Sequence, residues 1–188
     1  KAGIDALNET KPKRFLEFKR KMGTDWTAQK HPDFEGEVNA EELSAEILKK
    51  LKGEITDEHF KSVVITVPAL FHPGQVAATT RAGKMAGFEQ VEILMEPVAA
   101  GFHYVQKKKL KDGKLVVFDF GGGTFDAALI KVEGGVPNVV SSQGNNHLGG
   151  KDLDNKVVEK TLLPLLKENY DIDNLNKVQY EDLKNRML

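Results

Sequence analysis

The feature of this sequence that most limits its possible folds is a run of three glycines between two apolar segments. The run reads VVFDFGGGTFD over residues 116–126, with Asp119 before the glycines and Asp126 after them. Because β-branched and aromatic residues dominate both flanks, we predict two strands, Leu115–Phe120 and Thr124–Val132, the first of them buried. In Walker A loops and dinucleotide fingerprints the glycines lead from a strand into a helix, so this strand-to-strand turn fits neither.

The glycine turn has the chemistry of a phosphate site. Glycine permits left-handed backbone conformations, and without a Cβ the N–H groups of Gly121, Gly122 and Gly123 can approach a ligand closely. The hydroxyl of Thr124 can hydrogen-bond a terminal phosphate, and the two flanking aspartates can hold a hydrated divalent cation. On these residues alone, a plain hairpin with solvated acids at both ends remains an alternative.

Periodicity and capping residues predict strands that alternate with helices around this turn. Asn39 followed by Glu42 indicates a capping box that opens a helix running through Lys52. The other predicted elements are the strand Ser62–Val67, buried on both faces, the helix Pro73–Ala86, the strand Val91–Met95, the helix Glu96–Tyr104, the strand Val136–Ser142 and the helix Lys151–Asn169. Alternating strands and helices followed by an antiparallel meander indicate an α/β fold with a mixed sheet.

Composition excludes several classes of function. The 188 residues include 27 Lys and Arg against 28 Asp and Glu, a net charge of −1, so we expect neither nucleic acid nor a membrane as a partner. The absence of cysteine excludes disulfides, thiolate metal sites and a cysteine nucleophile. None of the five histidines has a second histidine at metal-ligand spacing. The chain lacks an initiating methionine, and we expect it to be a piece of a longer protein.

The stretch around the glycine turn carries a family resemblance. FDFGGGTFDAALI, residues 118–130, closely resembles the second phosphate loop of the DnaK-type, seventy-kilodalton heat-shock chaperones, which belong to the actin and sugar-kinase superfamily. Four further stretches are similar to the family in order and spacing: FLEFKRKMG at 15–23, VVITVPALF at 63–71, AGKMAGFEQVEILMEPVAAGFHY at 82–104 and HLGGKDLDNKVV at 147–158. The resemblance implies a partial actin-like, or ribonuclease H-like, ATPase domain, with mixed sheets, flanking helices and two incomplete lobes around a nucleotide cleft.

The same resemblance implies a division of the chain between the two lobes. Residues 1–61 would form a peripheral subdomain of lobe one, 62–112 part of its core, 113–150 part of the core of lobe two with the phosphate hairpin, and 151–188 the start of the outer subdomain of lobe two. By the family pattern, a first phosphate loop would precede Lys1 and the adenosine-binding segments would follow Leu188.

The resemblance also implies roles for individual residues. Lys19, Glu96, Asp119 and Thr124 match catalytic positions; Gly121, Gly122, Gly123 and Thr124 match phosphate-binding positions; Asp119 and Asp126 match metal-binding positions. The implied ligands are ATP or ADP with Mg²⁺, and K⁺ as an additional ion. The implied reaction is the in-line attack of water on the γ-phosphate, with Lys19 reaching the phosphate and the water, and Glu96 orienting the water.

Further implications concern partners and location. The family binds unfolded peptides through another domain, works with J-domain co-chaperones and nucleotide-exchange factors, and acts in the cytoplasm in the stress response and protein folding. This sequence departs from the family at Val76, where an arginine is usual, and at Glu92, where a basic residue is usual. These departures suggest an alternative, a chaperone-like regulatory or binding module without a normal ATPase cycle. A sugar kinase of the same superfamily is a second alternative.

Overall fold

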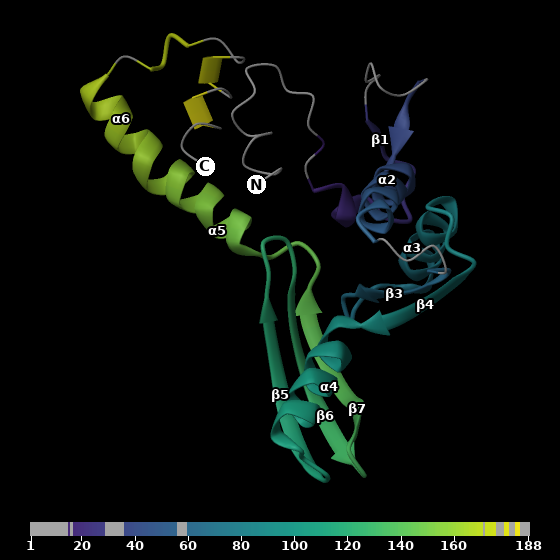
Figure 1. Ribbon diagram of the computed structural model, residues 1–188. Helices are drawn as coiled ribbons and strands as arrows, with labels where there is room; N and C mark the ends of the chain where they lie inside the picture. Colours follow the sequence, from purple (N-terminus) through teal and green to yellow (C-terminus); the bar gives the residue numbers. More distant parts are fainter. Residues whose placement is uncertain are drawn as a thin grey trace.

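The computed structural model describes residues 15, 17–28, 36–55, 60–170, 172–175, 179–180 and 183–184. Figure 1 shows these residues in three regions: a group of helices with two short sheets, a three-stranded sheet covered by one helix, and a long helical arm. No helix in these ranges is long and apolar enough to cross a membrane. The three regions meet near the turn between β5 and β6.

The first region is built on a capped helix. It contains the 3₁₀ turn η1 (Phe18–Lys21), the paired strands β1 (Thr27–Ala28) and β2 (Val38–Asn39), and the helix α2 (Ala40–Gly53). The predicted capping box is confirmed, since the Asn39 side chain accepts from the Glu42 N–H and the Glu42 carboxylate accepts from the Asn39 N–H, each at 2.9 Å.

Helix α2 packs on its neighbours through small residues. Met22, Ala40 and Ala45 form a buried cluster with two alanines of the next helix, Ala78 and Ala82. Small side chains at these positions let the helix backbones approach closely. Two larger residues of α2, Ile47 and Leu51, are exposed instead.

A parallel strand pair follows. Strand β3 (Ser62–Val67), helix α3 (Pro73–Met85) and strand β4 (Gln90–Met95) form a β-α-β unit, with β3 and β4 paired in parallel. Such a unit needs a helical crossover, and the Pro73–Met85 helix supplies it. The strands lie where predicted, but β3 is not buried on both faces, because Val64 is 57% exposed.

The three-stranded sheet places the glycine turn. After helix α4 (Glu96–Lys108), strands β5 (Gly113–Phe120), β6 (Phe125–Glu133) and β7 (Val136–Asn145) pair antiparallel in the order β5-β6-β7. Helix α4 covers one face, where Val105, Ala128, Ile130 and Val132 form a core cluster.

The other face of this sheet is apolar and exposed. Val116, Phe118 and Phe120 alternate with the inward residues of β5 and remain 40% to 74% exposed. The prediction that Leu115–Phe120 is buried is therefore wrong for every second residue. The sequence showed apolar residues on both faces of the strand, and α4 covers only one of them.

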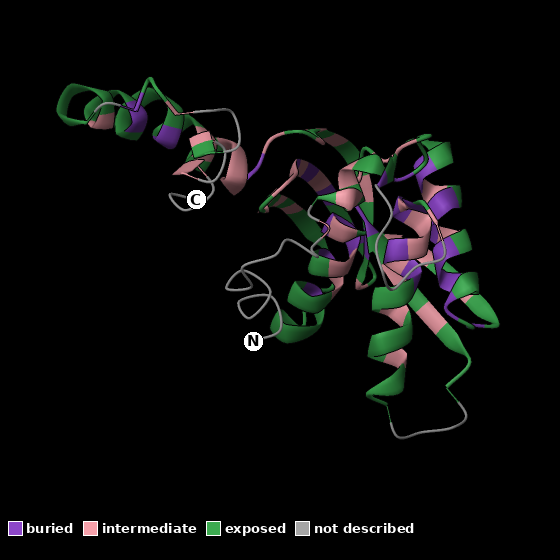
Figure 2. Ribbon diagram, turned by 90° about the horizontal axis from the view of Figure 1, so that it is seen from above, coloured by how far each residue is buried: buried purple, intermediate pink, exposed green. Residues whose placement is uncertain are grey.

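A long helical arm follows the three-stranded sheet. It consists of α5 (Gly150–Val157), the π-helical turn η2 (Val158–Leu162) and α6 (Leu163–Asn169), and most of it is exposed in Figure 2. The N–H of Leu163 bonds the carbonyl of Val158, which is the π-helical spacing, directly before Pro164. A π-turn beside a proline that cannot donate its own N–H is a recognised cause of helix irregularity.

The α/β class and the flanking helices are confirmed. Among the described residues, however, the expected mixed sheet separates into a parallel pair and two antiparallel sheets.

Candidate functional site

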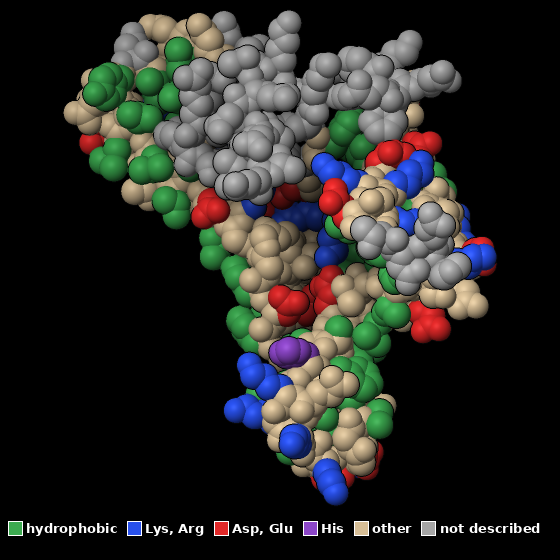
Figure 3. All heavy atoms as spheres, in the orientation of Figure 1, with side chains coloured by type: hydrophobic (Ala, Val, Ile, Leu, Met, Phe, Trp, Pro, Cys, Tyr) green, Lys and Arg blue, Asp and Glu red, His purple; other side chains and the backbone are tan. Residues whose placement is uncertain are grey.

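A cavity of about 580 Å³ lies where η1, α4, the β5–β6 turn and α5 meet. Figure 3 shows acidic and basic side chains gathered at the hollow between the α2 region and the three-stranded sheet. The residues that line the cavity are Glu17, Lys19, Arg20, Glu96, Asp119, Gly121, Gly122, Gly123, Thr124 and Lys151. Most of the predicted site residues thus lie around one space, although they come from distant parts of the sequence.

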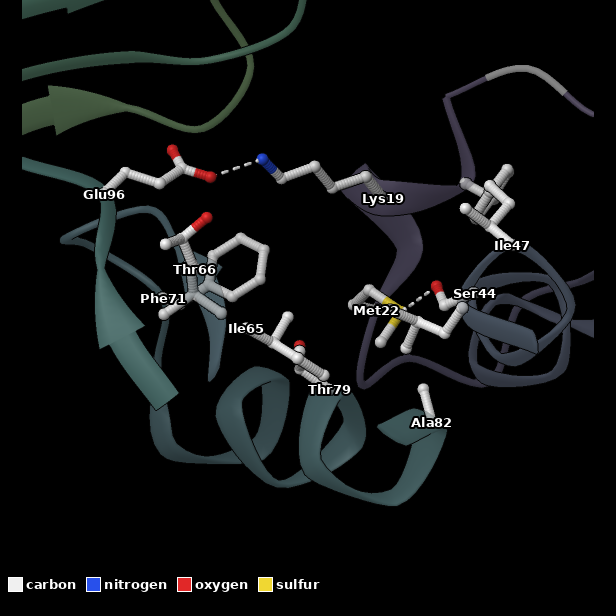
Figure 4. A pocket seen from close by; sticks show the side chains of 13 residues that line it. Lys19, Met22, Ser44, Ile47, Ile65, Thr66, Phe71, Thr79, Ala82 and Glu96 are labelled. Carbon is white, nitrogen blue, oxygen red and sulfur yellow. Dashed lines mark hydrogen bonds and ion pairs between the residues drawn. The ribbon is translucent and has the colours of Figure 1, made fainter. Parts of the chain in front are cut away.

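An ion pair closes one side of this cavity. The Lys19 Nζ lies 2.8 Å from the Glu96 Oε1, and Figure 4 shows the lysine reaching from η1 toward the glutamate. Glu96 is the first residue of α4, where Pro97 pre-sets the first turn and the helix dipole favours an acidic side chain. The lysine side chain is 52% exposed, so the pair contributes little to stability, and its amino group can move to another acceptor.

The two aspartates lie opposite each other across β5 and β6. Asp119 pairs with Asp126 in the strand register, so their side chains are on the same face of the sheet. Asp126 is buried, and neither of its carboxylate oxygens has a hydrogen-bond partner among the described residues. Burial raises the pKa of Asp126 above its ordinary value, and the charges of Glu96 and Asp119 raise it further. The charge of Lys19 and the backbone N–H of Ala69, which lies near the carboxylate but outside hydrogen-bonding geometry, oppose this rise in the pKa.

An unpaired buried carboxylate fits a site for a cation. No group of three or more His, Cys, Asp or Glu side chains in the described ranges is placed to hold a metal directly. Mg²⁺, however, usually keeps several waters and binds through one or two carboxylates together with substrate phosphates. Asp119 and Asp126 match that hydrated mode of binding.

The glycine turn is held by hydrogen bonds to its carbonyl groups. Within the turn, the Gly121 N–H donates to the Thr124 carbonyl at 3.0 Å. Three more donors bond the turn's carbonyls: the Gly150 N–H to Gly121 (2.9 Å), the Lys151 N–H to Gly122 (3.1 Å) and the Arg20 Nε to Gly123 (3.0 Å). The start of α5 and one arginine thus lie behind the turn.

The direction of these carbonyls determines where the N–H groups point. In a planar trans peptide the C=O and the following N–H point in opposite directions, and the described chain has no cis peptide. The N–H groups of Gly122, Gly123 and Thr124 therefore point away from α5, and no described residue accepts a hydrogen bond from them. These three successive N–H groups, which have no acceptor among the described residues, are called the cradle below, and such groups can bind an anion.

The prediction of left-handed glycines is wrong for this turn. None of the three glycines of the turn has a positive φ, so the expected left-handed conformations are absent. Close packing is found at Gly123 and at the neighbouring Gly149, whereas Gly122 has open space where a Cβ would be. A Cβ on Gly149 would lie 2.4 Å from the Gly122 carbonyl, and a Cβ on Gly123 would lie 3.2 Å from the Arg20 Nε.

Sequence reasoning missed Arg20 and Asp152. The guanidinium donates to both carboxylate oxygens of Asp152, at 3.2 and 2.5 Å, and its side chain is only 14% exposed. The hydrogen bond from Arg20 lowers the pKa of Asp152, and the carboxylate raises the pKa of Arg20. The one local signal was the position of Asp152 as the third residue of a helix, where a carboxylate caps free N–H groups.

A second, apolar cavity of about 330 Å³ shares Lys19 and Glu96 with the first. Figure 4 shows Met22, Ile65, Phe71 and Thr79 around it. The Lys19–Glu96 ion pair therefore lies at the boundary between a polar cavity and an apolar one.

Comparison with known proteins gives one family. The family model described as Hsp70 protein matches residues 8–187. Three similar proteins are named chaperone protein DnaK: that of Thermosipho africanus is 44% identical over 144 residues, that of Thermotoga maritima 41% over 152, and that of Mycoplasmopsis agalactiae 41% over 179. These matches cover 75%, 79% and 93% of this chain, and 24%, 25% and 29% of the relatives. The chain thus spans about a quarter of the length of these relatives, and their names do not favour the sugar-kinase alternative.

Proposed function

This chain belongs to the Hsp70 protein family, and on that premise we propose that it forms part of the ATP-binding and ATP-hydrolysing domain of a molecular chaperone. The observation that carries the proposal is one cavity lined by the glycine turn, the Lys19–Glu96 ion pair and Asp119, with the buried carboxylate of Asp126 opposite Asp119 in the strand register. Nucleoside triphosphate chemistry needs anion donors, a mobile cation and acidic groups for a metal in one place, and this cavity brings them together.

The glycine turn would bind the phosphates. The N–H groups of Gly122, Gly123 and Thr124 would donate to phosphate oxygens, and the Thr124 hydroxyl would add a further donor. Gly121 would contribute shape, because its own N–H already bonds Thr124. Hydrogen bonds to an ionised acceptor such as phosphate are about twice as strong as neutral ones, so several N–H donors in one turn can bind a phosphate group.

Asp119 and Asp126 would hold a hydrated Mg²⁺ beside the phosphates, with K⁺ as a second ion. When bound, the metal neutralises charge on the triphosphate. The unpaired oxygens of Asp126 support this assignment, because a cation would compensate a carboxylate that is otherwise costly to bury.

Lys19 and Glu96 would act on the reacting groups. Lys19 would leave its ion pair to donate to a γ-phosphate oxygen, and the freed Glu96 carboxylate would accept a hydrogen bond from the attacking water. The water oxygen forms a bond to the γ-phosphorus while the bond to the bridging oxygen breaks, releasing ADP and phosphate, and the proton of the water passes to phosphate or solvent. Positioning and charge neutralisation supply most of the catalysis in such a reaction.

The proposal extends to the lobes of the domain and to the partners of the whole protein. Residues 1–61 and 62–112 would belong to lobe one of an actin-like domain, and 113–150 and 151–188 to lobe two, with the nucleotide between them. The whole protein would bind unfolded peptides and work with a J-domain co-chaperone and an exchange factor, in the cytoplasm. Glu92 is exposed on β4, and with Val76 on α3 it would weaken coupling to these partners.

Phosphate release by the full-length protein with Mg-ATP tests the proposal. We expect slow hydrolysis that a J-domain protein or an unfolded peptide accelerates, and its loss in Asp126→Asn. Asp25→Asn, at an exposed position outside the cavity, is the matched control and should hydrolyse ATP normally. Failure of the unsubstituted protein to bind Mg-ATP would refute the proposal, and phosphorylation of a sugar would replace it with the kinase alternative.

A further inference from the structure

Arg20 and Lys19 are neighbours in η1 with opposite surroundings. Lys19 is half exposed and faces Glu96, whereas the Arg20 side chain is 14% exposed and contacts the glycine turn at the carbonyl of Gly123. The Arg20 Nε donates to the Gly123 carbonyl at 3.0 Å, and its two terminal nitrogens donate to Asp152 at 3.2 and 2.5 Å. All three nitrogens of the guanidinium are therefore engaged in fixed directions.

Asp152 is itself anchored, so the arginine has a rigid support. As the third residue of α5, Asp152 accepts the Gly149 N–H at 2.8 Å in addition to the two bonds from Arg20. A two-point bond between a guanidinium and a carboxylate fixes the orientation as well as the position of the arginine. The lowered pKa of Asp152 and the raised pKa of Arg20 keep both groups charged at neutral pH.

The three peptides of the glycine turn are not held in the same way. The carbonyls of Gly121 and Gly122 accept from backbone N–H groups of α5, at Gly150 and Lys151. The carbonyl of Gly123 accepts from the side chain of Arg20. Since the peptide is planar and trans, this bond also directs the N–H of the next residue, Thr124. The third N–H of the cradle thus depends on a side chain, whereas the first two depend on backbone.

We propose that Arg20, supported by Asp152, is a positioning residue that directs the Thr124 N–H toward a phosphate group of the nucleotide. The inference rests on the proposed function, since it concerns phosphate binding in the same cavity. Arg20 acts through the Gly123–Thr124 peptide, and its effect falls on the phosphates and not on the nucleoside.

A second explanation is that Arg20 contributes only its positive charge. Replacement by lysine separates the two, because lysine keeps the charge but cannot give the Nε bond and the two-point bond together. If charge alone matters, Arg20→Lys leaves phosphate binding nearly unchanged. If direction matters, Arg20→Lys and Asp152→Asn both weaken it.

The test is calorimetric titration of the full-length protein with Mg-ATP and, separately, with adenosine. For Arg20→Lys we expect Mg-ATP affinity to fall by about tenfold, as for loss of one hydrogen bond to a charged group, and adenosine affinity to stay within about twofold. Asp152→Asn should give a similar but smaller loss. The double variant should lose no more than Arg20→Lys alone, because both substitutions remove the same support.

Arg81 provides the matched control. It makes a two-point contact with Glu41, at 2.8 and 2.5 Å, between α3 and α2 and away from the cavity. Arg81→Lys should leave both affinities unchanged.

The outcomes distinguish this inference from the proposed function. No Mg-ATP binding by the unsubstituted protein overturns both. Normal binding by the unsubstituted protein with unchanged Mg-ATP affinity in Arg20→Lys and Asp152→Asn overturns only the positioning role. An equal loss of Mg-ATP and adenosine affinity also overturns it, because it shows a general structural effect. If Arg20→Lys fails to fold, the losses of Mg-ATP affinity and of adenosine affinity in Asp152→Asn are compared instead. Unchanged or equally reduced affinities in that variant overturn the positioning role.

Discussion

At the scale of single residues, the environment of a charge determines what that charge can do. Lys19 is exposed and paired with one movable partner, so it is available to a substrate. Asp126 is buried and unpaired, so its ionised form is costly until a cation or a proton compensates it. Lys19 therefore gives a prediction about the rate of ATP hydrolysis, and Asp126 gives one about the stability of the fold.

Lys19→Ala should abolish ATP hydrolysis by the full-length protein and leave ATP affinity within about tenfold, or roughly 1.4 kcal/mol. The lysine would act more strongly on the γ-phosphate in the transition state than on bound ATP, and its exposed ion pair contributes little to folding. Single-turnover hydrolysis measures the effect. A rate near that of the unsubstituted protein would remove Lys19 from the mechanism.

Asp126→Asn should stabilise the protein at neutral pH in the absence of divalent cations, by about 1 kcal/mol. The folded-state pKa of Asp126 is raised, so the folded protein holds this proton more tightly than the unfolded chain does. Stability from this group is therefore present at low pH and is lost as the pH rises through the folded-state pKa. Thermal melts across pH measure it, and the advantage of the variant should vanish in acid. An advantage that persists in acid, or none at neutral pH, contradicts the assignment.

At the scale of elements, the glycine turn and the start of α5 form one packed unit. Two glycines of this unit have opposite environments: Gly122 has open space where a Cβ would be, and Gly149 has none. Substitution at each should therefore separate function from folding.

Gly122→Val should damage nucleotide binding far more than folding. A Cβ there meets no atom within 4 Å, and Gly122 lines the cavity, so the valine would occupy space that phosphate needs. Nucleotide titration and a thermal melt on the same sample of full-length protein measure both effects. Loss of stability with intact binding in the folded fraction would mean that the turn is only structural.

Gly149→Ala should destabilise the protein by about 1–3 kcal/mol, the usual cost of overpacking. Its backbone is extended, so the alanine is strained by contact with the Gly122 carbonyl at 2.4 Å and not by its φ angle. The midpoint of thermal unfolding should fall by several degrees. Gly122→Ala is the control, and equal midpoints for the two variants would contradict this packing argument.

Much of the fold follows from the sequence, and the site follows in part. The α2 capping box, the strand positions and the gathering of Lys19, Glu96 and Asp119 around one cavity agree with the predictions. The roles of those residues remain predictions. Burial of β5 was wrong because apolar residues on both faces of a strand do not specify what covers each face. Arg20 was missed because no local pattern shows that a guanidinium will reach a carboxylate 132 residues away.

At the scale of the whole molecule, the 580 Å³ cavity is lined, among the described residues, by polar and small residues only. Its described lining consists of charged residues, glycines and Thr124, with no aromatic side chain to stack on an adenine ring. Small-ligand sites usually bury most of the ligand against apolar groups.

The 188-residue chain alone should therefore bind Mg-ATP weakly or not measurably, and should not hydrolyse it. A micromolar dissociation constant corresponds to a binding free energy of only about 8 kcal/mol. A site without an adenine pocket, and without the charged hydrogen bonds that the family's first phosphate loop would give, loses more than that. Isothermal titration of the monomeric chain is the direct test. A dissociation constant of about a micromolar or tighter would require a base-binding wall within residues 1–188.

The contacts of η1 join segments that are far apart in the sequence. Lys19 meets Glu96 across 77 residues, and Arg20 meets Gly123 and Asp152 across 103 and 132. The β5-β6-β7 hairpins, in contrast, join segments that are adjacent in the chain. Longer loops cost more entropy to close, and non-local contacts form late in folding. We therefore expect the cavity to form after these hairpins, and a substitution that weakens the η1 contacts to disrupt the site while the helices and strands stay in place.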